Sequence, residues 1–165
     1  MTENAKGKAL DWLEQNGITY ELLEHAPVFT VEEMDAAGIS ARGGVCKNLF
    51  LRDAKGKNHY LVVAPEEKRV DLAAVAEQLH STKLSFASAE RLEKYLGVAQ
   101  GSVSPLGVLN DGEHVVTVAF DQDLRTGGPV GVHPNDNTAT VWLSFEALRK
   151  GIAALGNPVT YLKLK

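Results

Sequence analysis

Two strand-like runs joined by a short turn constrain the fold of this chain more than any other feature. They are VCKNLFLRD (residues 45–53) and HYLVVAP (residues 59–65), and the polar segment AKGKN separates them. Apolar, β-favouring residues on both sides of a glycine-containing turn are typical of a β-hairpin. We therefore expect the two runs to pair within one sheet.

Helical and strand-like segments alternate along the rest of the chain. Hydrogen-bond acceptors at helix starts and glycines at helix ends predict five helices, and further apolar runs predict strands. Because turns and helices both connect the strands, we expect an α+β fold: a single domain over residues 1–165, with helices flanking a mixed, mainly antiparallel β-sheet. The expected strands are 18–25, 83–87, 138–144 and 159–164. The first expected helix ends at Gly17, the second runs from Thr30 to no further than Gly38, and the third begins at Asp71. The fourth runs from Ser88 to Gly97 and the fifth from Ser144 to Gly156.

The segment GSVSPLGVLNDG (residues 101–112) combines two patterns. In its second half an apolar run, 106–109, meets an Asn-Asp-Gly corner before HVVTVAF, which predicts a second hairpin. In its first half the consecutive amides from Gly101 to Ser104 are suited to bind a phosphate or carbonyl oxygen, and Gly101 permits a close approach. A plain turn stiffened by Pro105 is the alternative, and the local sequence alone favours it.

Lys47 lies among apolar residues in the first strand-like run. By strand alternation it shares a face with Val45, Leu49 and Leu51, whereas Cys46 points to the other face. An ammonium in this position either reaches water at the strand end or projects into a pocket, where it holds an anion or polarises a carbonyl. Both interpretations remain open.

Strong catalytic signatures are missing from the sequence. GSVSP lacks the glycine spacing of a nucleophile elbow, and no phosphate-binding loop ends in Gly-Lys-Ser/Thr. The histidines lack metal-ligand spacing and Cys46 has no evident histidine partner, so we expect no metal, no cofactor and no cysteine nucleophile. A third segment, GVHPNDNTATV, predicts a turn in which His133 or Asn137 binds either the neighbouring backbone or a ligand.

The charge of the chain limits its class of partner. A formal net charge of -4 argues against strong, non-specific nucleic-acid binding, because such binding needs many neutralised phosphates. The single cysteine indicates a reducing compartment, and no apolar run has the length of a signal-peptide core or a membrane span. We therefore expect a cytoplasmic protein without a membrane contact. Three groups of basic residues are candidates for a local nucleic-acid contact, although they could equally be ordinary solvated faces. They are Lys6 and Lys8, then Arg52, Lys55 and Lys57, then Lys68 and Arg69.

Three segments taken together resemble a known family. VCKNLFLRDAKGK, LSFASAERLEKYLGVAQGSVSPLGVLND and HPNDNTAT resemble the bacterial aminoacyl-tRNA deacylases related to the editing domain of prolyl-tRNA synthetase, the YbaK/prolyl-tRNA synthetase-associated editing domain family. The resemblance extends from about His25 to the helix near Leu148. It is strongest to the free-standing branch that hydrolyses Ala-tRNA(Pro), whose members also carry a stretch like HAPVFTVEE. It implies that residues 1–165 form one editing (deacylase) domain.

The resemblance also implies roles for individual residues. Lys47 matches the functional lysine of the family and Gly101 opens its substrate loop, so both are implied in catalysis. Near the HAPVFTVEE stretch, three apolar residues are candidates for a filter on amino-acid size, although they could equally belong to the core. These three are Val28, Phe29 and Met34; the residues implied to bind substrate are Ser102, Val103, Ser104 and Pro105 of the loop, with His133, Asn137 and Thr138 of the facing motif.

The implied function is hydrolysis, in trans, of the aminoacyl ester on mischarged tRNA(Pro), with alanine as the expected amino acid. A positioned water cleaves this activated ester without a metal, and the 2′-hydroxyl of the substrate helps to place the water. Three alternatives remain open: removal of cysteine or another small residue, a non-catalytic tRNA-binding or regulatory module, and hydrolysis of a small ester other than tRNA. The implied partner is the acceptor end of tRNA(Pro), and the acidic charge suggests capture together with prolyl-tRNA synthetase or an elongation factor.

Overall fold

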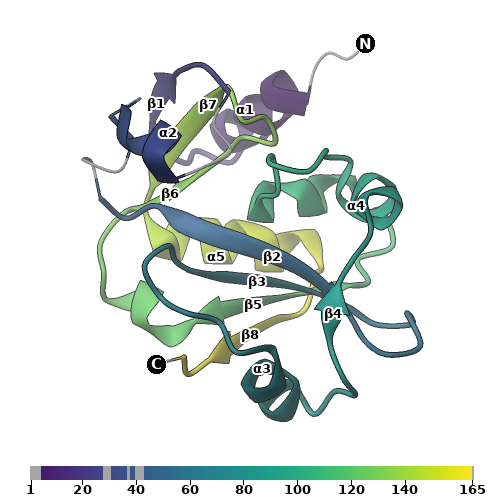
Figure 1. Ribbon diagram of the computed structural model, residues 1–165. Helices are drawn as coiled ribbons and strands as arrows, with labels where there is room; N and C mark the ends of the chain where they lie inside the picture. The colour runs from purple at the N-terminus through teal and green to yellow at the C-terminus, as the bar shows by residue number, and fades with distance from the viewer. Residues whose placement is uncertain (1–4, 28–30, 37, 40–42, 165) are drawn as a thin grey trace.

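The chain folds into two β-sheets with helices packed on their faces (Figure 1). The computed structural model describes residues 5–27, 31–36, 38–39 and 43–164, and of residues 31, 34 and 35 it describes only the backbone. The strands are β1 (Tyr20–Glu24), β2 (Cys46–Arg52), β3 (His59–Pro65), β4 (Ser85–Phe86), β5 (Val116–Asp121), β6 (Val130–Val132), β7 (Ala139–Leu143) and β8 (Val159–Leu162). The helices are α1 (Ala5–Gln15), α2 (Val31–Ala36), α3 (Leu72–Leu79), α4 (Ala89–Leu96) and α5 (Phe145–Leu155), with 3₁₀ turns η2 (Pro105–Asn110) and η3 (Gln122–Arg125).

The larger sheet is mixed and the smaller one is antiparallel. The larger has the strand order β4-β2-β3-β5-β8, and the smaller has the order β1-β7-β6. In the larger sheet β2 pairs antiparallel with β3 and β4, whereas the β3–β5 and β5–β8 pairs are parallel. The predicted α+β fold and the predicted β2–β3 hairpin are therefore confirmed, but the sequence did not indicate that the strands divide into two sheets.

The main apolar core fills the space between the two sheets and the helices that cover them. It contains Phe50 and Phe120 of the larger sheet, Val141 of the smaller sheet, and Leu148 of α5. A second cluster lies on the other face of the larger sheet, where Val75 of α3 packs. Figure 1 shows α3 and α5 on opposite faces of that sheet, which agrees with the two clusters.

The predicted helix boundaries rest on local capping, and the structure reproduces them. The side chains of Asp71, Ser88 and Ser144 each accept a hydrogen bond from a backbone N–H in the first turn of the helix that follows. Gly97 and Gly156 end their helices in the left-handed conformation. Of the helix expected to begin at Thr30, α2 is present, but Thr30 itself lies outside the described residues.

The predicted hairpin between residues 106–109 and the following strand is wrong. These residues belong to the 3₁₀ turn η2, and β5 lies parallel to β3 and β8. Pro105 occupies the first position of the turn and the Ser104 hydroxyl accepts a hydrogen bond from the Leu106 N–H at 3.1 Å, so this pair starts a helical turn. Leu106 and Val108 are buried in the main core, and apolar content alone could not distinguish this packing from a strand.

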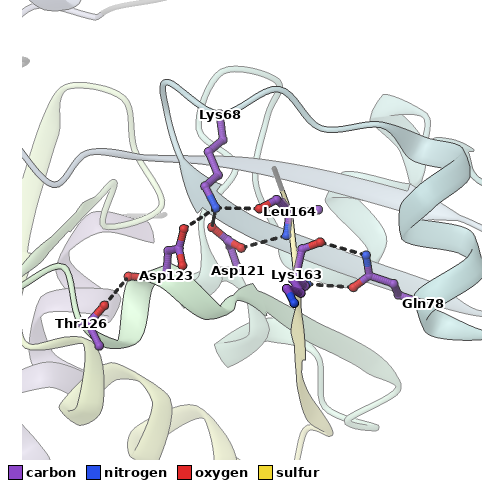
Figure 2. A network of polar contacts seen from close by, with 7 residues as sticks. All are labelled: Lys68, Gln78, Asp121, Asp123, Thr126, Lys163 and Leu164. Carbon is purple, nitrogen blue, oxygen red and sulfur yellow. Dashed lines mark hydrogen bonds and ion pairs between the residues drawn. The ribbon is translucent and has the colours of Figure 1, made fainter.

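A buried carboxylate anchors the C-terminal end of the chain (Figure 2). Asp121, which ends β5, is fully buried, and its oxygens contact the Lys68 ammonium at 2.7 Å and the Leu164 N–H at 3.2 Å. Lys68 also contacts Asp123 at 2.6 Å and donates to the Leu164 carbonyl at 2.9 Å. Because two carboxylates and a carbonyl surround this ammonium, Lys68 serves the fold and is a poor candidate for a nucleic-acid contact.

Candidate active site

Three segments that are far apart in sequence meet beside the smaller sheet. They are the end of β1 at His25, the turn of residues 133–138 between β6 and β7, and the loop of residues 101–104 before η2. The His25 N–H donates to the Thr138 carbonyl at 2.9 Å, and the Asn137 N–H donates to the Ser102 hydroxyl at 3.1 Å. The structure therefore brings together the loop and the facing motif that the sequence predicted as one site.

His133 is held in one tautomer. Its Nδ1 lies 2.8 Å from the Ala139 carbonyl, which can only accept, so Nδ1 carries the proton and Nε2 keeps a lone pair. Nε2 has no hydrogen-bond partner among the residues that the structure describes. Burial lowers the pKa of His133, and nearby His25 lowers it further, against the opposing effect of the Ala139 carbonyl. At neutral pH this imidazole is uncharged and able to accept a proton.

His25 is a site residue that the sequence analysis did not select. Its ring centroid lies 6.4 Å from that of His133. Its Nδ1 contacts the Ala26 carbonyl at 2.8 Å and its Nε2 contacts the Thr140 hydroxyl at 2.9 Å, so both ring nitrogens are occupied. His25 therefore forms a fixed wall beside His133. The sequence contains a signal for His25, which opens the HAPVFTVEE stretch, but its partner Thr140 could not be inferred from spacing.

Asp136 stabilises the turn that carries His133. One of its oxygens accepts from the Thr138 N–H at 2.8 Å and from the Thr138 hydroxyl at 2.6 Å. Burial raises the pKa of Asp136, but these hydrogen bonds and the charge of Lys6 outweigh that effect and lower it overall. The Thr138 hydroxyl, predicted to bind substrate, is thus engaged within the turn.

The loop of residues 101–104 has the geometry of a backbone donor surface. Gly101 has φ +89°, a conformation that side chains disfavour. The hydroxyls of Ser102 and Ser104 accept hydrogen bonds from backbone N–H groups, while Val103 packs against the main core. Within the described part of the chain, the N–H groups of Val103 and Ser104 donate to no acceptor. The polar residues of the loop therefore hold its shape and leave the amides of Val103 and Ser104 without a partner among the described residues.

Lys47 lies at the junction of the two sheets. It follows Val45 by two residues, and Val45 forms an isolated parallel bridge with Gly131, which precedes His133 by two residues. The bridge thus brings Lys47 and His133 to the same end of the junction. Lys47 is half-buried, and its ammonium makes no hydrogen bond or ion pair with any residue described in the structure.

The family of the chain follows from comparison with known proteins. The model of the aminoacyl-tRNA editing domain matches residues 25–150. The chain belongs to this family. The prolyl-tRNA editing protein ProX of Acetoanaerobium sticklandii is 49% identical over 164 residues, covering 99% of this chain and 100% of that protein. The prolyl-tRNA synthetase associated domain-containing protein 1 of Mus musculus is 36% identical over 145 residues, 85% of each chain.

A solved structure supports the fold of this editing domain independently. A crystal structure named as that of a proposed trans-editing enzyme for prolyl tRNA synthetase has a TM-score of 0.73 at 23% identity, covering 100% of this chain and 99% of that chain. The family and the fold that the sequence predicted are therefore confirmed.

Lys47 and its neighbour Cys46 of the editing domain point to opposite faces of β2. Lys47 shares a face with Val45 and Leu51, as strand alternation predicted. Val103 packs against the cluster that holds Cys46 and Phe50, which occupy the opposite face. The structure therefore brings Lys47 to the His133 end of the site, while Val103 of the loop packs against the main core.

Cys46 does not have the environment of a nucleophile. It is buried, and its thiol lies 3.7 Å from the Gly44 carbonyl. Burial, with the charges of Glu67 and Glu66, raises the pKa of Cys46 to about 12, so the thiol stays protonated at neutral pH. This agrees with the expectation from sequence.

Other predicted features of the editing domain are only partly within the described residues. Val28 and Phe29 lie outside them, and so does the side chain of Met34, although its backbone belongs to α2. Among the residues described, no group of histidine, cysteine or carboxylate side chains is arranged to hold a metal. No helix in the described part of the chain is long and apolar enough to cross a membrane.

Proposed function

We propose that this protein is a trans-editing deacylase that hydrolyses the ester of mischarged tRNA(Pro), with alanine as its preferred amino acid. One observation carries the proposal. The turn that presents Nε2 of His133 is hydrogen-bonded through Asn137 to the loop that holds the amides of Val103 and Ser104, and neither Nε2 nor these amides have a partner among the described residues. The ProX relative, which aligns with 99% of this chain and is named a prolyl-tRNA editing protein, supports tRNA(Pro) as the tRNA of the substrate.

Hydrolysis in this site needs one base and a set of hydrogen-bond donors. A water attacks the ester carbonyl carbon, and Nε2 of His133 takes its proton. Negative charge then develops on the carbonyl oxygen, where the N–H groups of Val103 and Ser104 are suited to stabilise it. Cleavage of the bond to the terminal ribose releases the amino acid, and the ribose oxygen recovers the proton.

Lys47 supplies positive charge to the same reaction. Its ammonium is unpaired among the described residues and lies at the His133 end of the sheet junction. We assign it to the substrate carbonyl or the terminal phosphate, both of which carry negative charge or develop it. The 2′-hydroxyl of the substrate helps to position the water, as the family resemblance implies.

Discrimination against proline is assigned to the segment that contains α2. A synthetic site that admits proline cannot strongly exclude the smaller alanine, so a second site must reject the larger, correct residue. We assign this filter to Val28, Phe29 and Met34. Prolyl-tRNA synthetase or an elongation factor remains the proposed partner for tRNA capture, because the chain carries a net charge of -4.

The test is an ester-loss assay on four substrates. The protein is incubated with tRNA(Pro) charged separately with alanine, cysteine and proline, and a small activated ester serves as a fourth substrate. We expect rapid loss of alanine and retention of proline. Preferential loss of cysteine would change the assigned substrate, hydrolysis of the small ester alone would favour the non-tRNA hydrolase, and no turnover at all would favour a binding module.

A further inference from the structure

Asn135 connects the turn that carries His133 to the 3₁₀ turn η2. Its Nδ2 donates to the Leu106 carbonyl at 3.1 Å, and Asn135 is only 5% exposed. Its backbone φ is +62°, an uncommon conformation for a residue other than glycine. None of these contacts was indicated by the sequence, in which Asn135 was only one polar residue of a turn.

The orientation of the Asn135 amide is dictated by its partner. The Leu106 carbonyl can only accept, so the amide nitrogen must face it. The opposite atom, Oδ1 of Asn135, is buried without a hydrogen-bond partner in the described part of the chain. A buried unpaired acceptor and a left-handed backbone both cost stability. Asn135 carries both of these costs beside the site, which indicates that its amide is required at this position.

Two hydrogen bonds, two residues apart, hold this turn against the loop segment. Asn135 binds the Leu106 carbonyl, and the Asn137 N–H binds the Ser102 hydroxyl. Leu106 is itself fixed, because it is buried and its N–H donates to the Ser104 hydroxyl. The turn therefore cannot slide along the loop without breaking both contacts.

We propose that Asn135 is a positioning residue, which holds Nε2 of His133 at a fixed place relative to the amides of the 101–104 loop. This inference rests on the proposed deacylation. Asn135 does not touch the substrate and acts through the placement of His133. Removal of its amide should therefore slow the chemical step more than it weakens substrate binding, since a shift of about 1 Å can cost on the order of a hundredfold in rate.

The test compares Asn135→Ala and Asn135→Gly with Asn157→Ala. Asn157 is a matched control, because it is also buried and its Nδ2 also donates to a backbone carbonyl, that of Val116, at 2.9 Å. Asn135→Gly permits the positive φ without the amide, which keeps the test informative if Asn135→Ala does not fold. For each variant, kcat and KM for Ala-tRNA(Pro), the thermal midpoint and the ring ¹H–¹⁵N signals of His133 are measured.

We expect both Asn135 variants to lose about tenfold to a hundredfold in kcat, with KM within about threefold and altered His133 ring signals. Asn157→Ala should lower the thermal midpoint and leave kcat within about twofold, because its contacts lie away from the site. Folded Asn135 variants with wild-type kcat and unchanged His133 signals overturn this inference alone. An inactive wild-type protein overturns the proposed function instead, and the ring signals then still report whether Asn135 places His133.

Discussion

The Ser102 hydroxyl accepts a hydrogen bond from the Asn137 N–H at 3.1 Å, although 35 residues separate the two in sequence. Ser102 is only 8% exposed, so water has little access to this contact. The hydroxyl therefore joins the loop to the turn, and in the proposed function substrate binding by this loop is assigned to its backbone.

Ser102→Ala should destabilise the protein and reduce deacylation only moderately. The Asn137 N–H loses a buried acceptor, which typically costs about 1–3 kcal/mol, while the amides of Val103 and Ser104 remain. We expect turnover to fall by less than about tenfold. Ser81→Ala is the control, because the one hydrogen bond of the Ser81 hydroxyl to a described residue is to its neighbour Thr82. Complete loss of turnover in a folded Ser102→Ala variant would instead assign the hydroxyl to the substrate.

Gly101→Ala should reduce deacylation much more than thermal stability. Its φ of +89° disfavours a side chain, and an added Cβ would disturb the amides of the loop. Gly128→Ala is a matched control, because Gly128 has φ +87° and open space around its Cβ position. Turnover and melting temperature are measured for both variants. Equal activity in the two variants, at equal melting temperature, would refute a catalytic role for the loop backbone.

Lys47→Ala should retain the fold and lose on the order of a hundredfold in deacylation, as expected for removal of one transition-state donor. The side chain makes no hydrogen bond or ion pair with a described residue that its loss would break. Lys150→Ala, on the exposed side of α5, controls for the loss of one positive charge. Single-turnover rates at saturating enzyme separate chemistry from tRNA binding. Near-normal rates would remove Lys47 from the mechanism.

Cys46→Ala should remain active. The pKa of Cys46, raised to about 12 by burial, leaves almost no thiolate at neutral pH. We expect the turnover of the variant to lie within about twofold of wild type. The check is the rate of Ala-tRNA(Pro) hydrolysis by the folded variant, and a large loss there would restore the thiol as nucleophile.

His59 should make the fold less stable in acid. It is buried, and its Nε2 accepts from the Arg91 guanidinium at 2.9 Å, so the ring is neutral. Burial lowers the pKa of His59 below its ordinary value of 6.5, and Arg91 lowers it further. The unfolded chain therefore binds a proton at this residue more readily than the folded one. The contribution of the neutral His59 ring to the free energy of unfolding is complete above pH 6.5 and declines as the pH falls below it.

Urea unfolding at about pH 7.5 and pH 5.5 measures this effect, and His59→Gln tests its source. Glutamine keeps an acceptor for Arg91 but does not titrate, so the variant should lose less unfolding free energy between the two pH values. Part of the dependence should persist, because the pKa of His133 is also lowered by burial. An unchanged pH dependence in His59→Gln would show that His59 is not the responsible group.

The sequence predicted those features whose causes are local. Asp71, Ser88 and Ser144 begin helices because each side chain caps a backbone N–H within three residues. The β2–β3 hairpin follows from two apolar runs around one turn. The apolar run at 106–109 predicts a strand, but its burial depends on a distant core and Ser104 caps a helical turn there.

Contacts within the site depend on residues that no spacing rule connects. The loop, His133 and Asn137 were selected by resemblance, but the hydrogen bond of Ser102 to Asn137 required the fold. His25 was passed over because its partner, Thr140, lies 115 residues away. Sequence could name the polar groups of the site, but only tertiary structure shows which of them are already bound to one another.

The separation of these partners along the chain also governs when the site can form. Long-range contacts close slowly, because the intervening chain must first lose its freedom. A nascent chain that has not yet emerged as far as Asn137 holds the 101–104 loop without Asn137 and His25 without Thr140. A ribosome-bound fragment of this kind would lack the arrangement around His133, so under the proposed function a nascent chain would not act on charged tRNA until residues 133–140 have emerged.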